Sequence, residues 1–277
     1  MSSLAELSRR LGRLKEISSI MTAMKSLSLV ETHKLARFMV QQRRMLGNIE
    51  AAAADFQHFF PLPAAREEAQ PIVLLIGSER GFCGNFNERV LAALESLPAW
   101  STPPRLLAVG QRLATKLAAH PQATESIDGA TVTEDVPAVL GRLMDTVHAG
   151  RRHTAATTIA LHGLAHDADG ELRLKQLLPL PALSAPPFMQ PPQLNLAPAE
   201  FLAELLDQYL LAALHGLLYE SLAAENRQRL AHMENALSRL DETLAGLALK
   251  RNALRQEKIV EEIEVMLSGK MAFSSQV

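Results

Sequence analysis

Apolar residues recur every three or four positions at the start of the chain, which is the spacing of one side of an α-helix. They are Leu4, Leu7, Leu11, Leu14, Ile17, Ile20, Met24 and Leu27. Residues 2–58 contain no proline and only two glycines, Gly12 and Gly47, so the composition gives no reason for a break. We predict a coiled-coil helix over residues 1–58 that buries this stripe against another helix.

The last part of the chain has the same character, because no proline follows Pro198. Its apolar residues alternate steps of three and four, as in a coiled-coil seam: Leu230, Met233, Leu237, Leu240, Leu244 and Leu247. We predict a second helix over residues 199–277. Two long amphipathic helices at opposite ends of one chain are most simply stabilised by packing on each other, so we expect an antiparallel pair.

The final turns, RNALRQEKIVEEIEVMLSGKMA, have a weaker apolar stripe and extend farther than the first helix could cover. We therefore expect something else to surround this tip. Glu261, Glu262 and Glu264 stand close together there, but adjacent carboxylates on a helix point in different directions. They indicate a solvated face rather than a catalytic carboxylate pair.

Residues 71–180 show a different sequence pattern, in which short runs rich in Val, Ile, Leu and Thr alternate with segments of helical periodicity. The predicted strands cover residues 71–77, 105–110, 154–163 and 171–180, and the predicted helices lie near 86–97, 111–119 and 136–150. This alternation predicts a small, central, doubly wound (Rossmann-like) α/β domain. A proline-rich linker over residues 181–198 separates it from the last helix.

The charge and cysteine content limit the class of partner and the compartment. A net charge of −2 argues against nucleic acid as the main partner, although the first segment is locally basic. A single cysteine forms neither an internal disulfide nor a CxxC metal site, which favours a reducing compartment. The N-terminus lacks the apolar region of a signal peptide, so we expect a cytosolic protein, or one attached to a membrane only through partners.

The bend SERGFCGN follows a strand and precedes a helix, which is where a phosphate-binding loop would lie. However, neither GxGxxG nor GxxxxGK[ST] is present, and no lysine follows to reach a phosphate. Cys83 as a nucleophile would need a base, and no histidine is near it in sequence. A small residue packed in a tight turn is the preferred interpretation; an enzyme working through Cys83 stays a hypothesis.

The histidines show no metal-ligand spacing such as HExxH. His162 and His166 stand where a strand is predicted to end, and we interpret them as solvated loop histidines. We expect no metal, no cofactor and no catalytic site in this chain, so its function should lie in its geometry.

Three blocks of the sequence resemble the gamma subunit of F-type ATP synthases, over essentially the full length. The first is LSRRLGRLKEISSIMTAMKSLSLVETHKLARF, and the second is SERGFCGNFN, which is similar to the family's DRG-CG turn. The third is SLAAENRQRLAHMENALSRLDETLAGLALKRNALRQEKIVEEI, in which the matching residues are Glu225, Arg229, Met233, Asn252, Arg255, Gln256, Ile259 and Glu262.

The resemblance implies a non-catalytic rotor shaft that couples ion flow through a membrane ring to conformational change in a catalytic hexamer. It implies alpha, beta and epsilon subunits and the c-ring as partners, at the cytoplasmic face of a bacterial inner membrane. It assigns contact with the catalytic hexamer to Lys25, Arg255, Gln256 and Glu262. It gives a structural role in the turn to Arg80, Gly81, Cys83, Gly84 and Asn87.

Some positions depart from the family pattern and suggest a divergent paralogue, for which the N-type ATPase is one candidate. Ser26 replaces a second methionine, Val260 stands where a threonine contact is usual, and Gln190 replaces a Glu-Pro glutamate in the linker. The alternative function, from a different class, is a free-standing coiled-coil scaffold that binds some other helix.

Overall fold

The computed structural model describes residues 4–60, 71–97, 100, 102–118, 123–152, 160–181 and 190–274. The predicted linker falls partly outside this set, because residues 182–189 are not described. The chain divides into two compact units, one formed by residues 28–229 and the other by residues 1–27 and 230–277.

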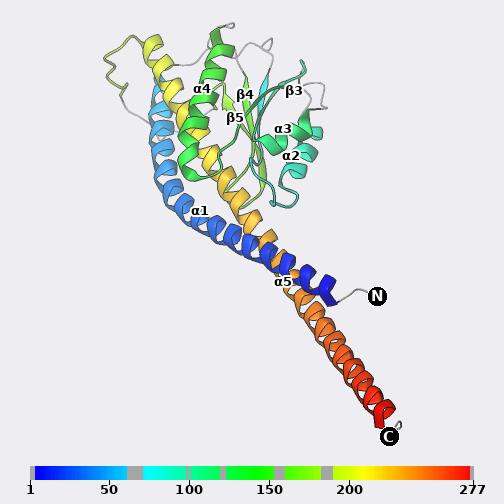
Figure 1. The fold of residues 1–277 in the computed structure, drawn as a ribbon. Helices are drawn as coiled ribbons and strands as arrows, with labels where there is room; N and C mark the ends of the chain where they lie inside the picture. The colour runs from blue at the N-terminus through cyan, green and yellow to red at the C-terminus, as the bar shows by residue number, and fades with distance from the viewer. Residues whose placement is uncertain are drawn as a thin grey trace. The chain divides into compact units, whose positions relative to one another are not determined.

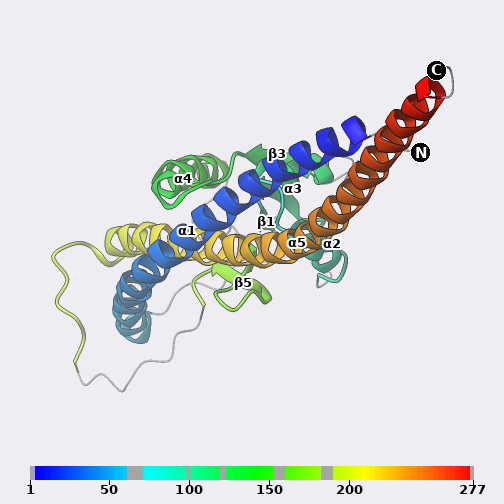
Figure 2. The same ribbon diagram turned by 60° about the horizontal axis from the view of Figure 1, so that its bottom comes forward.

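Two unbroken helices run through both units. Helix α1 covers Leu4–Phe59 and helix α5 covers Pro198–Ser274. In the larger unit they run antiparallel (Figure 2), since Phe56 packs on Phe201 while Gln42 donates a hydrogen bond to the Ala212 carbonyl. In the smaller unit the two helices are linked by an ion pair between Lys25 of α1 and Glu234 of α5. The predicted pair of long helices is therefore confirmed.

The larger unit contains a five-stranded sheet in the order β3-β2-β1-β4-β5. The strands are β1 (Ile72–Ile76), β2 (Arg105–Val109), β3 (Ala123–Ile127), β4 (Leu161–His166) and β5 (Leu172–Leu178). Strands β1 to β4 are parallel, and β5 is antiparallel to β4. The sequence did not predict β3, because this edge strand, ATESI, has no apolar run. Residues 154–159 of the predicted third strand lie outside the described set.

Helices cover both faces of this sheet, which confirms the doubly wound architecture (Figure 1). Helices α2 (Phe86–Glu95) and α3 (Gln111–Leu117) pack on the face formed by Val73 and Leu75. A short 3-10 turn, η1 (Thr133–Asp135), leads into α4 (Val136–Arg152), which packs with α1 and α5 on the opposite face. Leu74 and Ile76 point to that second face, because neighbouring strand residues alternate sides.

Helix α5 is the core helix of the larger unit. By length and composition alone it contains an 18-residue window apolar enough to cross a membrane, with a mean hydropathy of 1.3. Half of that window is buried within the protein, and Leu210 and Leu214 are completely buried. Its apolar character is therefore explained by packing against the sheet and α1.

In the smaller unit the seam of α5 is confirmed, but the predicted stripe on α1 is wrong at Ile17, Ile20 and Leu27. Met233 is buried, and the leucines that continue the seam are half-buried. On α1, Ile17, Ile20 and Leu27 are 46%, 61% and 62% exposed. The inward positions there follow a strict seven-residue repeat (7, 11, 14, 18, 21, 25), so that Ile17 and Ile20 each stand one residue before an inward position.

Replacing Leu240 by aspartate should destabilise the helix pair, because Leu240 is half-buried in the seam and a carboxylate there loses water without gaining a partner. We expect a loss of about 1–3 kcal/mol in the free energy of unfolding, measured by far-UV circular dichroism during thermal melting. The control is Leu249→Asp on the same helix, where the side chain is 73% exposed. Equal melting of the two variants would contradict the packing.

Candidate functional site

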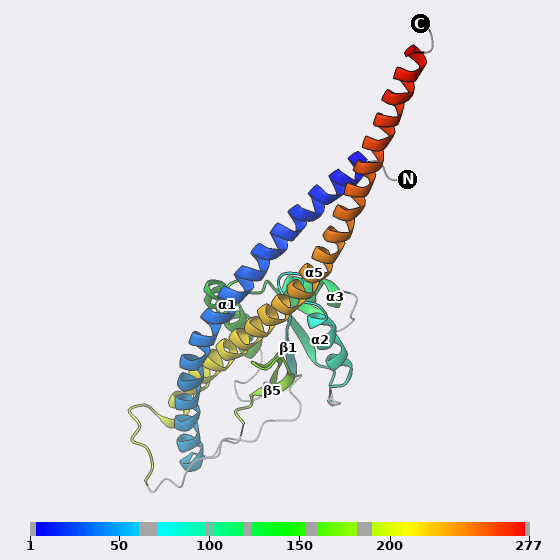
Figure 3. The ribbon, with the colours of Figure 1, turned by 90° about the horizontal axis from the view of Figure 1, so that it is seen from below.

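The last turns of α5 are not covered by any other part of the chain that the structure describes. Every described side chain from Arg255 to Leu267 is exposed, and the C-terminal turns continue beyond the N-terminal end of α1 (Figure 3). The exposed apolar residues of this tip are Ile259, Val260, Ile263, Val265, Met266 and Leu267. At about 100° per residue, five of these side chains fall within about 120° of the helix circumference, and only Val265 lies apart from them. An exposed apolar helix face of this kind normally packs against another protein surface.

Three of the residues predicted to contact the catalytic hexamer lie on this tip. Arg255, Gln256 and Glu262 are exposed, and Glu262 lies 3.9 Å from Lys258. Lys25 is in a different setting, since its ammonium group forms a 3.0 Å ion pair with Glu234 of α5. The structure thus brings the first three residues onto one uncovered segment and separates Lys25 from them. Their contact with another subunit stays a prediction.

A second apolar surface lies on α1 within the smaller unit. Ile17, Ile20 and Leu27 are exposed, and Met24 between them is half-buried. These are the residues that the sequence placed in the helix seam. Because the seam uses other positions, they form a separate apolar stripe that is available to a partner.

The glycine-rich bend after β1 is a structural corner. Asn87 accepts a hydrogen bond from the Ser78 backbone at 2.9 Å and donates one to the Ser78 hydroxyl at 2.8 Å. Phe82 and Gly84 adopt the left-handed region, with φ of 64° and 60°, which turns the chain sharply toward α2. A phosphate-binding role has no support in this geometry.

Cys83 is buried in the corner beside Phe86 and Ala224, which supports the predicted packing role. Burial raises the pKa of its thiol, although a hydrogen bond to the Ser78 hydroxyl lowers it in part. A thiol that is harder to ionise is a poor nucleophile. The hypothesis of an enzyme working through Cys83 is therefore disfavoured.

A buried ion pair of α5 holds this corner. The Arg229 guanidinium binds the Glu225 carboxylate and also donates to the Gly81 carbonyl at 3.2 Å. Backbone N–H groups of Glu79 and Arg80 donate to Glu225 as well. Burial raises the pKa of the Glu225 carboxyl to about 7, and the charge of Arg229 offsets part of that effect. The pair ties the loop after β1 to the long helix.

This pair occupies the place where doubly wound folds usually bind a ligand. That place is the crevice at the carboxyl ends of the strands where the strand order reverses, here between β1 and β4. Sequence reasoning from the residues did not find Glu225 and Arg229, which entered only through the family resemblance. A signal was present, since a glutamate and an arginine four residues apart directly follow the largely apolar stretch of residues 209–224.

The interpretation of His162 and His166 as solvated is wrong. His166 ends β4 with only 1% of its surface exposed, and its ring stacks on Phe86 at 3.9 Å between centroids. Neither ring nitrogen has a hydrogen-bond partner among the described residues. Burial lowers the pKa of His166 to about 4, helped by the nearby charge of Arg89. His162 is half-buried beside Trp100, and burial lowers its pKa too.

The carboxylates of the tip are exposed, as the sequence predicted: Glu261, Glu262 and Glu264 all face solvent. Within the described part of the chain, no group of three or more His, Cys, Asp and Glu side chains has a metal-binding arrangement.

The Glu225–Arg229 pair should show strong coupling in a double-mutant cycle. Glu225→Leu leaves an arginine that cannot lose its charge, and Arg229→Met leaves a buried carboxyl group without its partner, so each single variant should lose about 3 kcal/mol of unfolding free energy. The double variant should lose much less than the sum, because neither charge remains. Chemical denaturation of the four proteins gives the coupling, and additive losses would contradict a paired burial.

His166 should make stability depend on pH between about 4 and 6.5. Its pKa is lower in the folded protein than the usual value near 6.5, so as pH falls the unfolded chain takes up the proton first and stability decreases. Between pH 7 and 4.5 the wild type should lose about 2–3 kcal/mol more than His166→Leu, measured by denaturant unfolding. Because Glu225 titrates alike in both proteins, their difference isolates His166, and parallel pH profiles would contradict its burial.

Comparison with known proteins identifies the family. The family model described as ATP synthase matches residues 3–273. The ATP synthase gamma chain of Pelotomaculum thermopropionicum is 25% identical over 98% of this chain and 99% of its own length.

Solved structures give the same fold. A chain of the Euglena gracilis mitochondrial ATP synthase, in an OSCP/F1/c-ring structure, has a TM-score of 0.66 at 14% identity and covers 98% of this chain and 94% of its own length. A chain of the rotor from the same organism has a TM-score of 0.61 at 12% identity, with 92% and 98% covered. The chain therefore belongs to the ATP synthase family, as the gamma-type, non-catalytic subunit of the central stalk.

Proposed function

We propose that this subunit is a rotor shaft that couples ion flow through a membrane ring to conformational change in a catalytic hexamer. The observation that carries the proposal is the uncovered tip of α5. One unbroken helix of 77 residues is a core element of the α/β unit in its first part, and its last turns expose a face of apolar side chains. Such a tip needs an apolar sleeve supplied by other subunits.

The proposed sleeve consists of the alpha and beta subunits, and the α/β unit is proposed to bind the epsilon subunit and the c-ring. The relatives with this fold include chains of a rotor and of an F1/c-ring assembly, which supports these partners. In a bacterial cell the complex would place the chain at the cytoplasmic face of the inner membrane. In this proposal residues 1–58 and 199–277 form the shaft, residues 71–180 form the foot, and residues 181–198 link them.

The unequal lengths of the helix pair give the shaft an asymmetric surface. The tip presents α5 alone, whereas the preceding turns present α5 together with the exposed stripe of Ile17, Ile20 and Leu27 on α1. A sleeve of three equivalent catalytic sites would meet a different surface at each site. Rotation of the shaft would then change the conformation of the three sites in turn.

We also propose that the chain belongs to a divergent, N-type branch of the family. Ser26, Val260 and the exposed Gln190 support this, because each departs from the family pattern at a contact position. Purification of the tagged chain from its native membranes tests both ideas. Alpha, beta and ring subunits should remain bound, and the sequence of the ring subunit identifies the branch. Recovery with unrelated helical partners would favour a scaffold instead.

The double substitution Arg255→Ala and Gln256→Ala should lower ATP hydrolysis coupled to ion transport in the assembled complex. Both side chains are exposed on the tip, where they offer hydrogen bonds to an acidic loop of a catalytic subunit. We expect about a tenfold loss, as for one or two charge-assisted hydrogen bonds. The measurement is turnover of the purified complex, with circular dichroism of the isolated chain to show that folding is unchanged.

The matched control is Gln111→Ala with Arg112→Ala, which removes the same two residue types from an exposed helix surface of the α/β unit. It should leave ATP hydrolysis close to the wild-type rate. Unchanged turnover of the Arg255 and Gln256 variant would count against the tip contact.

A further inference from the structure

Helix α1 contacts the α/β domain through a buried carboxylate. Glu31 is only 7% exposed, and its Oε2 atom accepts hydrogen bonds from the Thr133 backbone at 2.8 Å and from the Thr133 hydroxyl at 2.7 Å. Thr133 begins the η1 turn that leads into α4. A side chain of α1 therefore accepts the hydrogen bonds of a residue 102 positions away in sequence, at the start of the turn that leads into α4.

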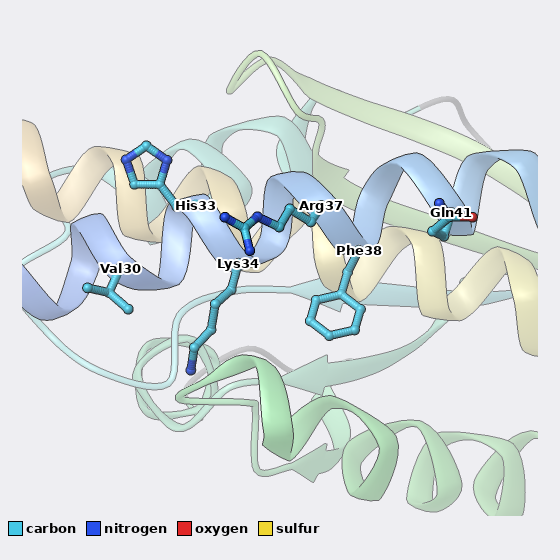
Figure 4. A pocket seen from close by; sticks show the side chains of 6 residues that line it. All are labelled: Val30, His33, Lys34, Arg37, Phe38 and Gln41. Atoms are coloured by element: carbon cyan, nitrogen blue, oxygen red, sulfur yellow. The ribbon is translucent and has the colours of Figure 1, made fainter.

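Lys34 reinforces this contact. Its ammonium group lies 2.9 Å from Glu31 and 2.9 Å from Glu134. Figure 4 shows Lys34 pointing from α1 toward the start of α4, along a groove of about 740 Å³ that Val30 and Phe38 also line. Burial alone would raise the pKa of Glu31, but the hydrogen bonds from Thr133 and Lys34 outweigh it and lower that pKa. Glu31 is thus a charged, fully bonded group at neutral pH.

The position of this contact along the helices is informative. The α/β unit covers residues 28–229, so Glu31 lies three residues inside one limit, and Arg229 with its bond to Gly81 lies at the other. Between these limits the helices pack mainly through apolar side chains, with hydrogen bonds from Gln42 to the Ala212 carbonyl and from Gln57 to the Pro181 carbonyl. Apolar packing is not directional, whereas a hydrogen bond requires a narrow range of angles. Each helix therefore has a directional bond to the α/β domain close to where it leaves that unit.

We propose that Glu31 is a positioning residue whose bonds to Thr133 fix the rotational setting of α1 against the α/β domain. The proposal rests on the rotor function, in which torque passes between the α/β domain and the helix pair. A fixed setting prevents α1 from turning within its apolar contacts under load. Loss of the bonds lets part of each rotational step be absorbed inside the subunit.

Two threonines at the same helix start provide a matched test. Thr133→Val removes the hydroxyl bond to Glu31 of α1. Thr131→Val removes an equally short hydroxyl bond, 2.6 Å to Asp135, that stays within the α/β domain. Both substitutions keep the side-chain shape and delete one hydrogen bond to a carboxylate. Glu31→Gln is a second variant of the Glu31–Thr133 contact, and Thr133→Ser keeps a hydroxyl at that position.

The experiment uses inverted membrane vesicles that carry the complete complex. ATP synthesis driven by an imposed ion gradient is divided by the uncoupled ATP hydrolysis rate of the same vesicles. Thr133→Val and Glu31→Gln should lower this ratio about fivefold, the effect of one hydrogen bond, with hydrolysis near the wild-type rate. Thr131→Val and Thr133→Ser should keep the wild-type ratio.

Equal ratios for Thr133→Val and Thr131→Val would overturn the inference while leaving the rotor function intact. A fall in both synthesis and hydrolysis together would also overturn it, because that pattern indicates general destabilisation. A wild-type complex that contains the chain but shows no gradient-driven synthesis and no ATP-driven ion transport would overturn the rotor function itself.

Discussion

The burial of one side of α5 is the constraint on which the rest of the structure depends. Leu210, Leu214 and Leu217 of this helix join the sheet, α4 and α1 in one apolar core. The same helix continues without a break through residues 230–274, which belong to the other unit. No proline follows Pro198, so the composition gives no reason for the helix to break over this length.

The α/β domain uses a ligand-binding architecture for a mechanical purpose. Its sheet reverses order between β1 and β4, where related folds leave a crevice for a nucleotide. Here Arg229 and Glu225 of α5 supply the charges in that place, and the Gly81 carbonyl and neighbouring N–H groups bind them as they would bind a ligand. The helix takes the place of the ligand and is thereby fixed to the sheet.

Exposed apolar residues have two different origins in this chain. Those of the tip, such as Ile263 and Met266, are exposed because no other described part of the chain packs on them. Those on α1, such as Ile20, are exposed because the helix pair uses the adjacent positions. Both belong to a subunit whose surface is completed by assembly. An isolated chain would bring these surfaces into contact with water, which favours association with other subunits.

The sequence by itself determined the two long helices, the α/β character of the middle domain and the seam from Leu230 to Leu247. Each of these is specified by apolar residues that recur at helix or strand spacing among neighbouring positions. The sequence also identified the corner around Cys83 through the tight turn that its glycines allow. Only the tertiary structure decided which side of α1 faces inward after Ile17, since one residue of helical phase separates two plausible stripes. The burial of His166 and the partners of Glu31 and Arg229 were likewise decided by tertiary structure, because they depend on residues far apart in sequence that only the folded chain brings together.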